Sequence, residues 1–136
     1  MVDSDGTVLD KMTEDAQATL ASARRVLETE IGGIRALSAA LDEGFARAVD
    51  LIAAASGRVI VTGMGKSGHI ANKIASTLAS TGTPSQYVHP GEASHGDLGM
   101  ITADDVVIAL SNSGETAELT DIVAYAKLKR IPLISV

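Results

Sequence analysis

The sequence contains no cysteine and no tryptophan, and its aromatic side chains are one phenylalanine and two tyrosines. Without cysteine the chain has neither a disulfide framework nor a thiolate metal site, which fits a reducing compartment and predicts a cytoplasmic protein. Because 46% of the residues are hydrophobic but only 2% are aromatic, the core must consist mainly of Ala, Val, Ile and Leu. Such a core is typical of helices packed on a parallel sheet.

Basic runs and long hydrophobic runs are also missing. The formal net charge is −6 and the 11 Lys and Arg residues are scattered, so no surface is expected to neutralise nucleic-acid phosphates. The longest uninterrupted apolar stretch is five residues, as in 51–55, which is too short for a membrane span or a signal-peptide core. The sequence therefore predicts neither a nucleic-acid partner nor a membrane partner.

The N-terminal third has the pattern of helices. Residues 1–12 are expected to be a flexible N-terminus and residues 13–136 a single domain, since 136 residues suit one core. Apolar residues recur every three or four positions from Leu9 to Leu41, which predicts a long amphipathic helix. A second helix is expected over 42–55, and its inward face is predicted to hold Phe45, Ala48, Val49 and Ile52. These helices either cover the sheet or take part in subunit contacts, because so long a helix has more apolar face than one small sheet needs.

A glycine-rich turn follows the first predicted strand, residues 59–61. It contains Gly63, Gly65 and Gly68, and a helix follows it. The predicted inward face of that helix consists of Ile70, Ala71, Ile74, Ala75, Leu78 and Ala79. Unpaired N–H groups at a helix start bind anions, and glycines let a phosphate come close. With Lys66 as a mobile positive charge, the turn predicts a site for a phosphorylated small molecule at the carboxyl end of a parallel strand.

A second strand end has similar chemistry. Residues 105–110 form a continuous apolar run, typical of a strand buried on both faces, and a helix is expected to begin directly after the hydroxyl-rich turn that follows. That turn contains Ser111, Ser113 and Thr116 around Gly114, and the inward face of the helix is predicted to hold Ala117, Leu119, Ile122, Val123 and Ala126. Hydroxyl and N–H groups at a helix start predict a second anion site. Glu118 is either a partner of the helix dipole or, beside a bound sugar, a general base.

A polar segment, residues 89–100, follows the short strand predicted over 86–88. It is expected to be an irregular loop, because it is too polar and too rich in glycine for a helix or a strand. Its histidines and acids can be metal ligands or proton carriers, or they can belong to a hydrogen-bonded structural loop. These residues are His89, Glu92, His95 and Asp97. His69, in the start of the preceding helix, is expected to be a capping or packing residue.

The alternation of strands and helices predicts the fold class. A last strand is expected over 132–136, so the pattern indicates an α/β, doubly wound and mostly parallel sheet flanked by helices. No helix follows that strand to cover it. We therefore expect a domain that is incomplete after its fourth strand, or a partner that supplies the missing layer.

Two nucleotide motifs fit the glycine turn poorly. Its glycines satisfy the dinucleotide pattern G-x-G-x-x-G, but Val88 and His89 stand where an acidic residue should receive the ribose hydroxyls. A Walker A loop also fails, because Ile60 occupies the position of its first glycine. The sequence thus favours a phosphorylated metabolite over a nucleotide.

Three motifs together resemble the sugar isomerase (SIS) domain with its flavodoxin-like fold, and more narrowly the D-arabinose 5-phosphate isomerase family. They are GMGKSGHIANKIASTLASTGTPS over 63–85, VHPGEASHGDLGM over 88–100 and DVVIALSNSGETAEL over 105–119. The resemblance implies reversible conversion of D-ribulose 5-phosphate to D-arabinose 5-phosphate, a step toward the lipopolysaccharide sugar Kdo in Gram-negative bacteria. It implies no organic cofactor, a tetramer, and zinc as an inhibitor. The family pattern continues beyond Val136 with further strands, another catalytic Glu and His, and usually a pair of CBS domains.

The resemblance also implies site residues. Lys66 and Glu118 match catalytic positions, Gly82, Thr83, His89 and His95 match substrate contacts, and His89 also matches a zinc contact. Aldose–ketose isomerisation needs a base, an oxyanion stabiliser and a phosphate site. Glu118 or His95 can move the proton and Lys66 can stabilise the enediolate. Phosphate is expected at Ser111, Ser113 and Thr116 and at the turn that includes Gly65 and Ser67. Two alternatives remain open: another phosphosugar isomerase, or a non-catalytic SIS module that senses a sugar phosphate.

Overall fold

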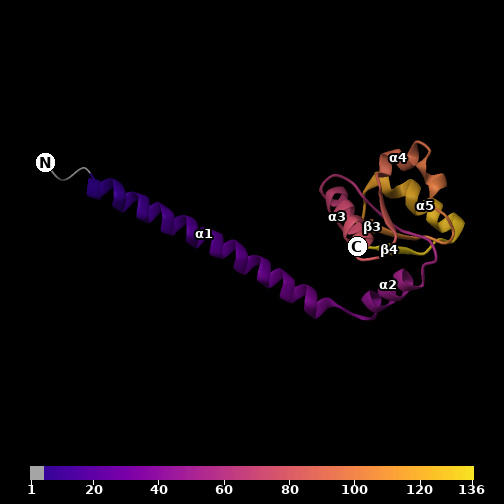
Figure 1. The fold of residues 1–136 in the computed structure, drawn as a ribbon, viewed down its shortest axis with the longest axis horizontal. Coiled ribbons are helices and arrows are strands. Elements are labelled where there is room, and N and C mark those ends of the chain that lie inside the picture. The colour runs from indigo at the N-terminus through magenta and orange to yellow at the C-terminus, as the bar shows by residue number, and fades with distance from the viewer. Residues whose placement is uncertain (1–4) are drawn as a thin grey trace. The chain divides into compact units, whose positions relative to one another are not determined.

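The structure is a computed structural model that describes the backbone from residue 5 and the side chains from residue 13 onward. The first four residues of the expected flexible N-terminus, and the side chains of the rest of it, lie outside the described residues. Contacts divide the chain into two units, residues 1–43 and 44–136. The elements in order are α1 (Asp5–Ala40), α2 (Glu43–Ala54), β1 (Val59–Gly63), α3 (Lys66–Ser80), β2 (Ser85–Val88), α4 (Pro90–Ser94), η1 (Asp97–Met100), β3 (Val106–Leu110), η2 (Ala117–Leu119), α5 (Thr120–Lys129) and β4 (Leu133–Ser135), where η marks a 3-10 helix (Figure 1).

The second unit is built on a four-stranded, fully parallel sheet in the order β2-β1-β3-β4. Within it Val59 is aligned with Ser85 of β2 on one side and with Val106 of β3 on the other. Both β1 and β3 are buried along their whole length, as continuous apolar runs in a parallel sheet should be. The predicted α/β, mostly parallel fold is confirmed.

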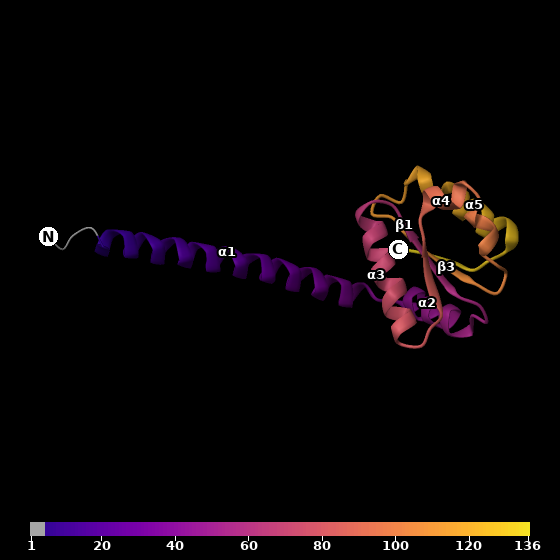
Figure 2. The ribbon, with the colours of Figure 1, turned by 45° about the horizontal axis from the view of Figure 1, so that its top comes forward.

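Helices cover both faces of the sheet, and Figure 2 shows α3 on one side and α4 and α5 on the other. Because side chains alternate along a strand, Val59 and Val61 of β1 pack toward α3 while Ile60 packs toward α4 and α5. On the α3 side the helix contributes the small residues Ala71 and Ala75. Small side chains let α3 lie close to the strands.

Some of the predicted inward faces are wrong. Ile70 is 57% exposed and Ala79 is exposed as well, because α3 starts at Lys66 and presents Gly68, Ala71 and Ala75 to the sheet. Of the residues predicted to face inward in α2, Ala48 and Ile52 are half-buried, whereas Phe45 is 56% and Val49 47% exposed.

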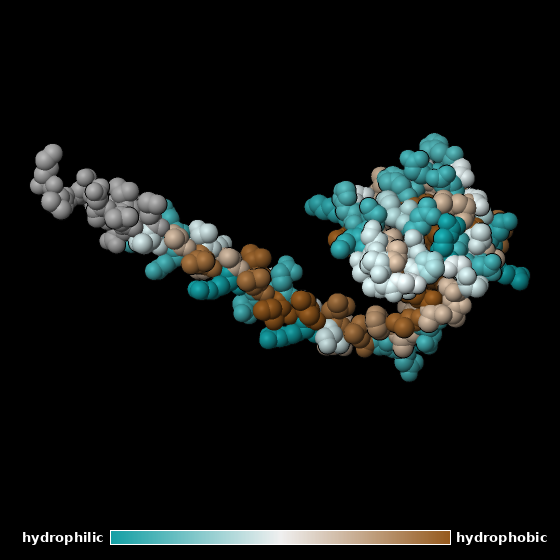
Figure 3. Space-filling model, in the orientation of Figure 1, coloured by the Kyte–Doolittle hydropathy of each residue, from teal (hydrophilic) through white to brown (hydrophobic). Residues whose placement is uncertain are grey.

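The apolar residues of helix α1 are exposed to solvent. All its side chains from Thr13 onward are exposed, including Leu20, Leu27, Ile31, Ile34 and Leu37. Figure 3 shows the corresponding apolar surface, in brown, on α1. None of the helices in the described part of the chain combines the length and the apolar composition that a membrane-spanning segment needs.

Candidate functional site

The strand order places a candidate site at the carboxyl ends of β1 and β3. After β1 the chain turns toward β2, and after β3 it turns toward β4, so the two connections leave neighbouring strands in opposite directions. Open α/β sheets bind ligands at such a switch point, because the diverging loops leave a crevice between them. Gly63 and Leu110 are aligned at the two strand ends, so both loops start side by side.

The first loop, residues 63–68, is named the glycine loop. A Cβ added to Gly68 would lie 2.7 Å from the Gly63 carbonyl oxygen, and a Cβ on Gly63 would lie 3.0 Å from the Ser67 carbonyl. Gly65, the N-cap of α3, has a φ of 57°, in the left-handed region. The helix start can therefore pack directly against the strand end only because side chains are absent there.

The electrostatics of the start of α3 suit the anion site that the sequence predicts there. No side chain caps the helix, and its first turn contains no acidic residue. Lys66, its first residue, is exposed, and Ser67 beside it is half-buried. Backbone N–H groups with the positive end of the helix dipole behind them thus face the carboxyl edge of the sheet beside a lysine.

The second loop, residues 111–116, is named the hydroxyl loop, and its own side chains give it its shape. Ser111 Oγ lies 2.7 Å from Thr116 Oγ1 and accepts a hydrogen bond from the Gly114 N–H at 3.0 Å. Ser113 Oγ accepts from the Glu115 N–H at 3.2 Å. The Ser113 O–H remains available to donate to a ligand, because that hydroxyl uses only its acceptor capacity in the loop.

The prediction that an α-helix begins directly after the hydroxyl loop is wrong. A 3-10 turn, η2, follows the loop, and α5 begins only at Thr120. Leu119, Ile122 and Ala126 are buried as predicted, while Ala117 is exposed and Val123 half-buried. Glu118 lies in η2 and is exposed, so its carboxylate is not at the start of an α-helix.

A cavity of about 610 Å³ lies beside the hydroxyl loop. Ser111, Gly114 and Thr116 line it on one side, and residues of α5 and β4 line the other. Lys127 of α5 is among them. An anion held by the hydroxyl loop would therefore be next to a space large enough for a small metabolite.

The polar segment 89–100 is more regular than predicted. It forms α4 and η1, because Pro90 stands at the first helical position and the His89 side chain caps the helix. His89 Nδ1 accepts a hydrogen bond from the Gly91 N–H at 3.1 Å. A neutral His89 with this bond carries its proton on Nε2, which can donate to a substrate oxygen. His89 Nδ1 therefore has the structural, hydrogen-bonded role that was one of the alternatives for this segment.

A metal contact in this segment requires a different state of His89. Among the side chains described from residue 13 onward, no group of three His, Cys, Asp or Glu could hold a metal ion. A zinc ion on His89 Nε2 would need the lone pair that the capping tautomer protonates, so binding would cost the cap hydrogen bond. The zinc contact stays a prediction. His95 follows α4, is exposed, and is the C-cap of that helix.

Tyr87 connects these parts, a role that no sequence pattern indicated. Its O–H donates to the Gly63 carbonyl at 3.1 Å, and its ring lies edge-on to the His89 ring with centroids 6.4 Å apart. Burial raises the pKa of the Tyr87 hydroxyl, so it remains a donor at neutral pH. Tyr87 thus contacts both the end of β1 and the histidine after β2. The alternation of β2 places its ring on the α3 side, but only the tertiary structure shows what the hydroxyl reaches.

The structure brings together most, but not all, of the predicted site residues. The carboxyl edge carries Gly65, Lys66 and Ser67 after β1, His89 after β2, and Ser111, Ser113 and Thr116 after β3. Gly82 and Thr83 lie at the opposite, amino edge, where the neighbouring Pro84 carbonyl accepts from the Val59 N–H at 2.8 Å. These two residues therefore do not reach the loops of their own chain.

Comparison with known proteins assigns the domain. A sequence model of the SIS domain matches residues 51–136. The chain belongs to the SIS domain family. It is 56% identical over 114 residues to arabinose 5-phosphate isomerase KdsD of Pseudomonas aeruginosa, an alignment that covers 84% of this chain and 35% of the relative. It is 53% identical over 111 residues to KdsD of Yersinia pestis, covering 82% of this chain and 34% of that protein.

A similar solved structure carries a ligand. The chain resembles an Escherichia coli CFT073 protein in complex with arabinose 5-phosphate, with a TM-score of 0.81 and 41% identity over 88% of this chain and 63% of that one. The present chain spans about a third of the length of the curated relatives that it matches. The predicted family is confirmed, and the same region carries the glycine loop, the hydroxyl loop and the histidines.

Proposed function

We propose that this SIS domain binds a sugar phosphate between β1 and β3 and interconverts D-ribulose 5-phosphate and D-arabinose 5-phosphate. The observation that carries the proposal is the pair of loops that start from the aligned residues Gly63 and Leu110. One loop offers backbone N–H groups and a lysine, and the other offers hydroxyls. The names of the relatives support this choice of substrate. The product, arabinose 5-phosphate, would supply Kdo synthesis in the cytoplasm.

The proposed chemistry moves one proton between adjacent carbons. A base removes a proton from C1 of the ketose, the electrons form an enediolate, and the proton is delivered to C2 while the hydroxyl proton moves from O1 to O2. Glu118 and His95 are the candidate bases, and Lys66 stabilises the negative oxygen. Ser113 and Thr116 hold the phosphate with the N–H groups of the glycine loop.

The test is incubation of the protein with ribulose 5-phosphate, with arabinose 5-phosphate measured as product. Lys66→Ala should abolish turnover, because it removes the charge that stabilises the enediolate. Lys73→Ala, which removes an exposed lysine further along α3, is the control and should retain activity. A near-normal rate for Lys66→Ala would remove Lys66 from the mechanism. Binding of sugar phosphates without any turnover in the unchanged protein would favour a sensing module.

We also propose that the protein is a homo-oligomer, with a tetramer as the expected state. Leu20, Leu27 and Ile34 of α1 are each more than half exposed, an apolar surface suited to a second copy. The position of Gly82 and Thr83 supports the same proposal, because they could contact substrate only in the site of another subunit.

The oligomer proposal has its own test. Leu27→Gln with Ile34→Gln should lower the molar mass measured by light scattering, because both changes make the apolar surface of α1 polar. Ser22→Gln, on another side of the same helix, is the control and should leave the mass unchanged. An unchanged mass in the double variant would exclude this surface as the contact.

A further inference from the structure

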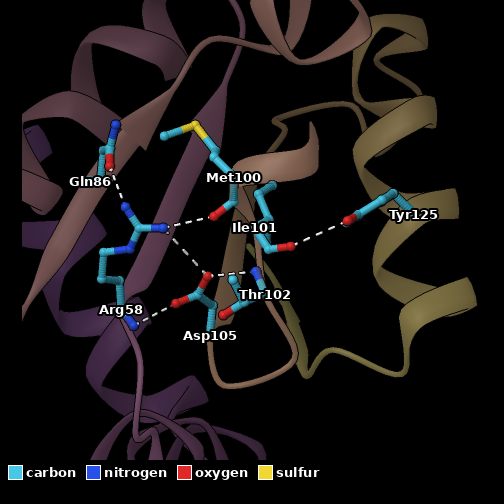
Figure 4. Close-up of polar contacts among 7 residues, drawn as sticks. All are labelled: Arg58, Gln86, Met100, Ile101, Thr102, Asp105 and Tyr125. Carbon is cyan, nitrogen blue, oxygen red and sulfur yellow. Dashed lines mark hydrogen bonds and ion pairs between the residues drawn. The ribbon is translucent and has the colours of Figure 1, made fainter. Parts of the chain in front are cut away.

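The amino edge of the sheet contains a polar cluster far along the strands from the two ligand loops (Figure 4). At its centre is Asp105, which is only 2% exposed. Its Oδ1 accepts from the Arg58 N–H at 2.6 Å, and its Oδ2 accepts from the Thr102 N–H at 2.8 Å. The Arg58 guanidinium Nη2 lies 3.8 Å from the same Oδ2. The buried carboxylate is therefore both hydrogen-bonded and charge-compensated, as a buried charge must be.

The Arg58 side chain extends the cluster to two other elements. Its Nη1 donates to Gln86 Oε1 of β2 at 2.9 Å, and its Nη2 donates to the carbonyl of Met100 at 2.7 Å. Met100 is the last residue of η1, so the guanidinium satisfies a carbonyl at the end of that helix. Tyr125 of α5 donates to the next carbonyl, that of Ile101, at 3.3 Å.

Three consecutive backbone positions are thus bonded to side chains, two of which come from distant parts of the chain. Met100 is held by Arg58, Ile101 by Tyr125 and Thr102 by Asp105 (Figure 4). The side chains of Arg58, Asp105 and Tyr125, here named the clamp, hold the end of the segment 89–100, which crosses from the carboxyl edge to the amino edge.

The two halves of that segment are attached differently. In the first half, Pro90 and Ala93 of α4 are buried, and Ala93 packs in the same core cluster as Ile122 of α5. In the second half, residues 95–100, Leu98 and Met100 are only partly buried against the core, so apolar packing fixes this half less firmly. The clamp and the buried side chain of Ile101 together therefore fix the end of residues 95–100.

We propose that Arg58 and Asp105 are positioning residues for catalysis, acting through residues 95–100, which include His95. The inference rests on the proposed function. The clamp contacts neither the glycine loop nor the hydroxyl loop, so its loss should shift His95 while phosphate binding remains. Misplacement of a reacting group by about 1 Å can cost roughly 100-fold in rate.

The test compares Arg58→Met with Arg58→Lys and with the control Arg130→Met. Arg58→Met keeps the apolar stem but loses the side-chain bonds to Met100 and Gln86. It should lower kcat about tenfold or more, while the Kd for inorganic phosphate stays within about twofold, as expected when only positioning is lost. Arg58→Lys should recover most of kcat, since an ammonium can still reach the Met100 carbonyl. Arg130, exposed after α5, gives the same change of side chain away from the clamp and should leave kcat unchanged.

Amide hydrogen exchange provides a readout independent of turnover. In Arg58→Met the amides of 95–102 should exchange faster, while those of the two ligand loops keep wild-type rates. Tyr125→Phe should give a smaller change in the same direction, and it serves where Arg58→Met fails to fold. A kcat within twofold of wild type, or parallel losses of kcat and phosphate affinity, would overturn the inference. If the wild type turns over no sugar phosphate, the proposed function fails, and unchanged exchange over 95–102 would overturn the clamp separately.

Discussion

The glycine loop and the hydroxyl loop start from neighbouring strand ends, yet opposite means give them their shapes. In the glycine loop, Gly68 lies where any Cβ would collide with the Gly63 carbonyl. In the hydroxyl loop, Ser111 Oγ bonds both the Gly114 N–H and the Thr116 hydroxyl. The glycine loop therefore needs positions without a side chain, whereas the hydroxyl loop needs the oxygen atoms of its side chains. Added atoms should damage the first loop, and removed atoms the second.

The largest effect should follow from Gly68→Ala. Its Cβ would lie 2.7 Å from the Gly63 carbonyl oxygen and 2.8 Å from the Tyr87 hydroxyl, and backbone on that side cannot easily move. Overpacking of this kind costs about 3 kcal/mol, which should lower the Tm by roughly 10 °C in a domain of this size. Gly99→Ala is the matched control, because nothing lies within 4 Å of its added Cβ. Equal Tm values for the two variants in a thermal scan would contradict the close approach.

A smaller effect is expected from Ser111→Ala, which removes one oxygen from the hydroxyl loop. The loop loses its bonds to Gly114 and Thr116, and their groups turn to water. The affinity for inorganic phosphate should fall by about 1 to 2 kcal/mol, the value of one or two hydrogen bonds. Ser76→Ala, whose hydroxyl bonds the Asn72 carbonyl within α3, should bind phosphate normally. Titration calorimetry would decide, and an affinity equal to wild type would mean that the loop does not need Ser111.

The smallest effect should come from Tyr87→Phe, which keeps the ring against His89 and removes the bond to the Gly63 carbonyl. One such bond contributes about 0.5 to 1 kcal/mol to the free energy of unfolding. The variant should also change the pH dependence of stability. Burial raises the pKa of Tyr87 above its ordinary value of 10.0, so its contribution is present below pH 10.0 and is lost as the pH rises through the folded-state pKa.

Denaturant titrations at neutral and at alkaline pH measure both parts of the Tyr87 prediction. The wild type should lose stability above about pH 10, and Tyr87→Phe should lose less of it. If both proteins lose stability equally there, Tyr87 is not the group that titrates.

Residues 89–100, here called the histidine segment, have a structure that the sequence pattern did not predict. Glycines and polar residues over 89–100 predict an irregular loop, but Pro90 and the His89 cap form α4 there, and η1 follows. Capping depends on a side chain that folds back on its own backbone, which composition does not reveal. The hydroxyl loop is a similar case, because bonds among Ser111, Gly114 and Thr116 shape the turn and a 3-10 turn replaces the predicted helix start.

The sequence by itself determined the parallel sheet, the two loops after β1 and β3, and the family. Continuous apolar runs and glycine spacing are local patterns, and local patterns fix strands and turns. Only the tertiary structure decided that Gly82 and Thr83 lie at the opposite edge from the loops, that Tyr87 bonds Gly63, and that Arg58 and Asp105 hold the end of the histidine segment. The bonds of Tyr87 to Gly63 and of Arg58 to Met100 join residues more than 20 positions apart. Such pairs are set by how strands are ordered in the sheet, which no local spacing records.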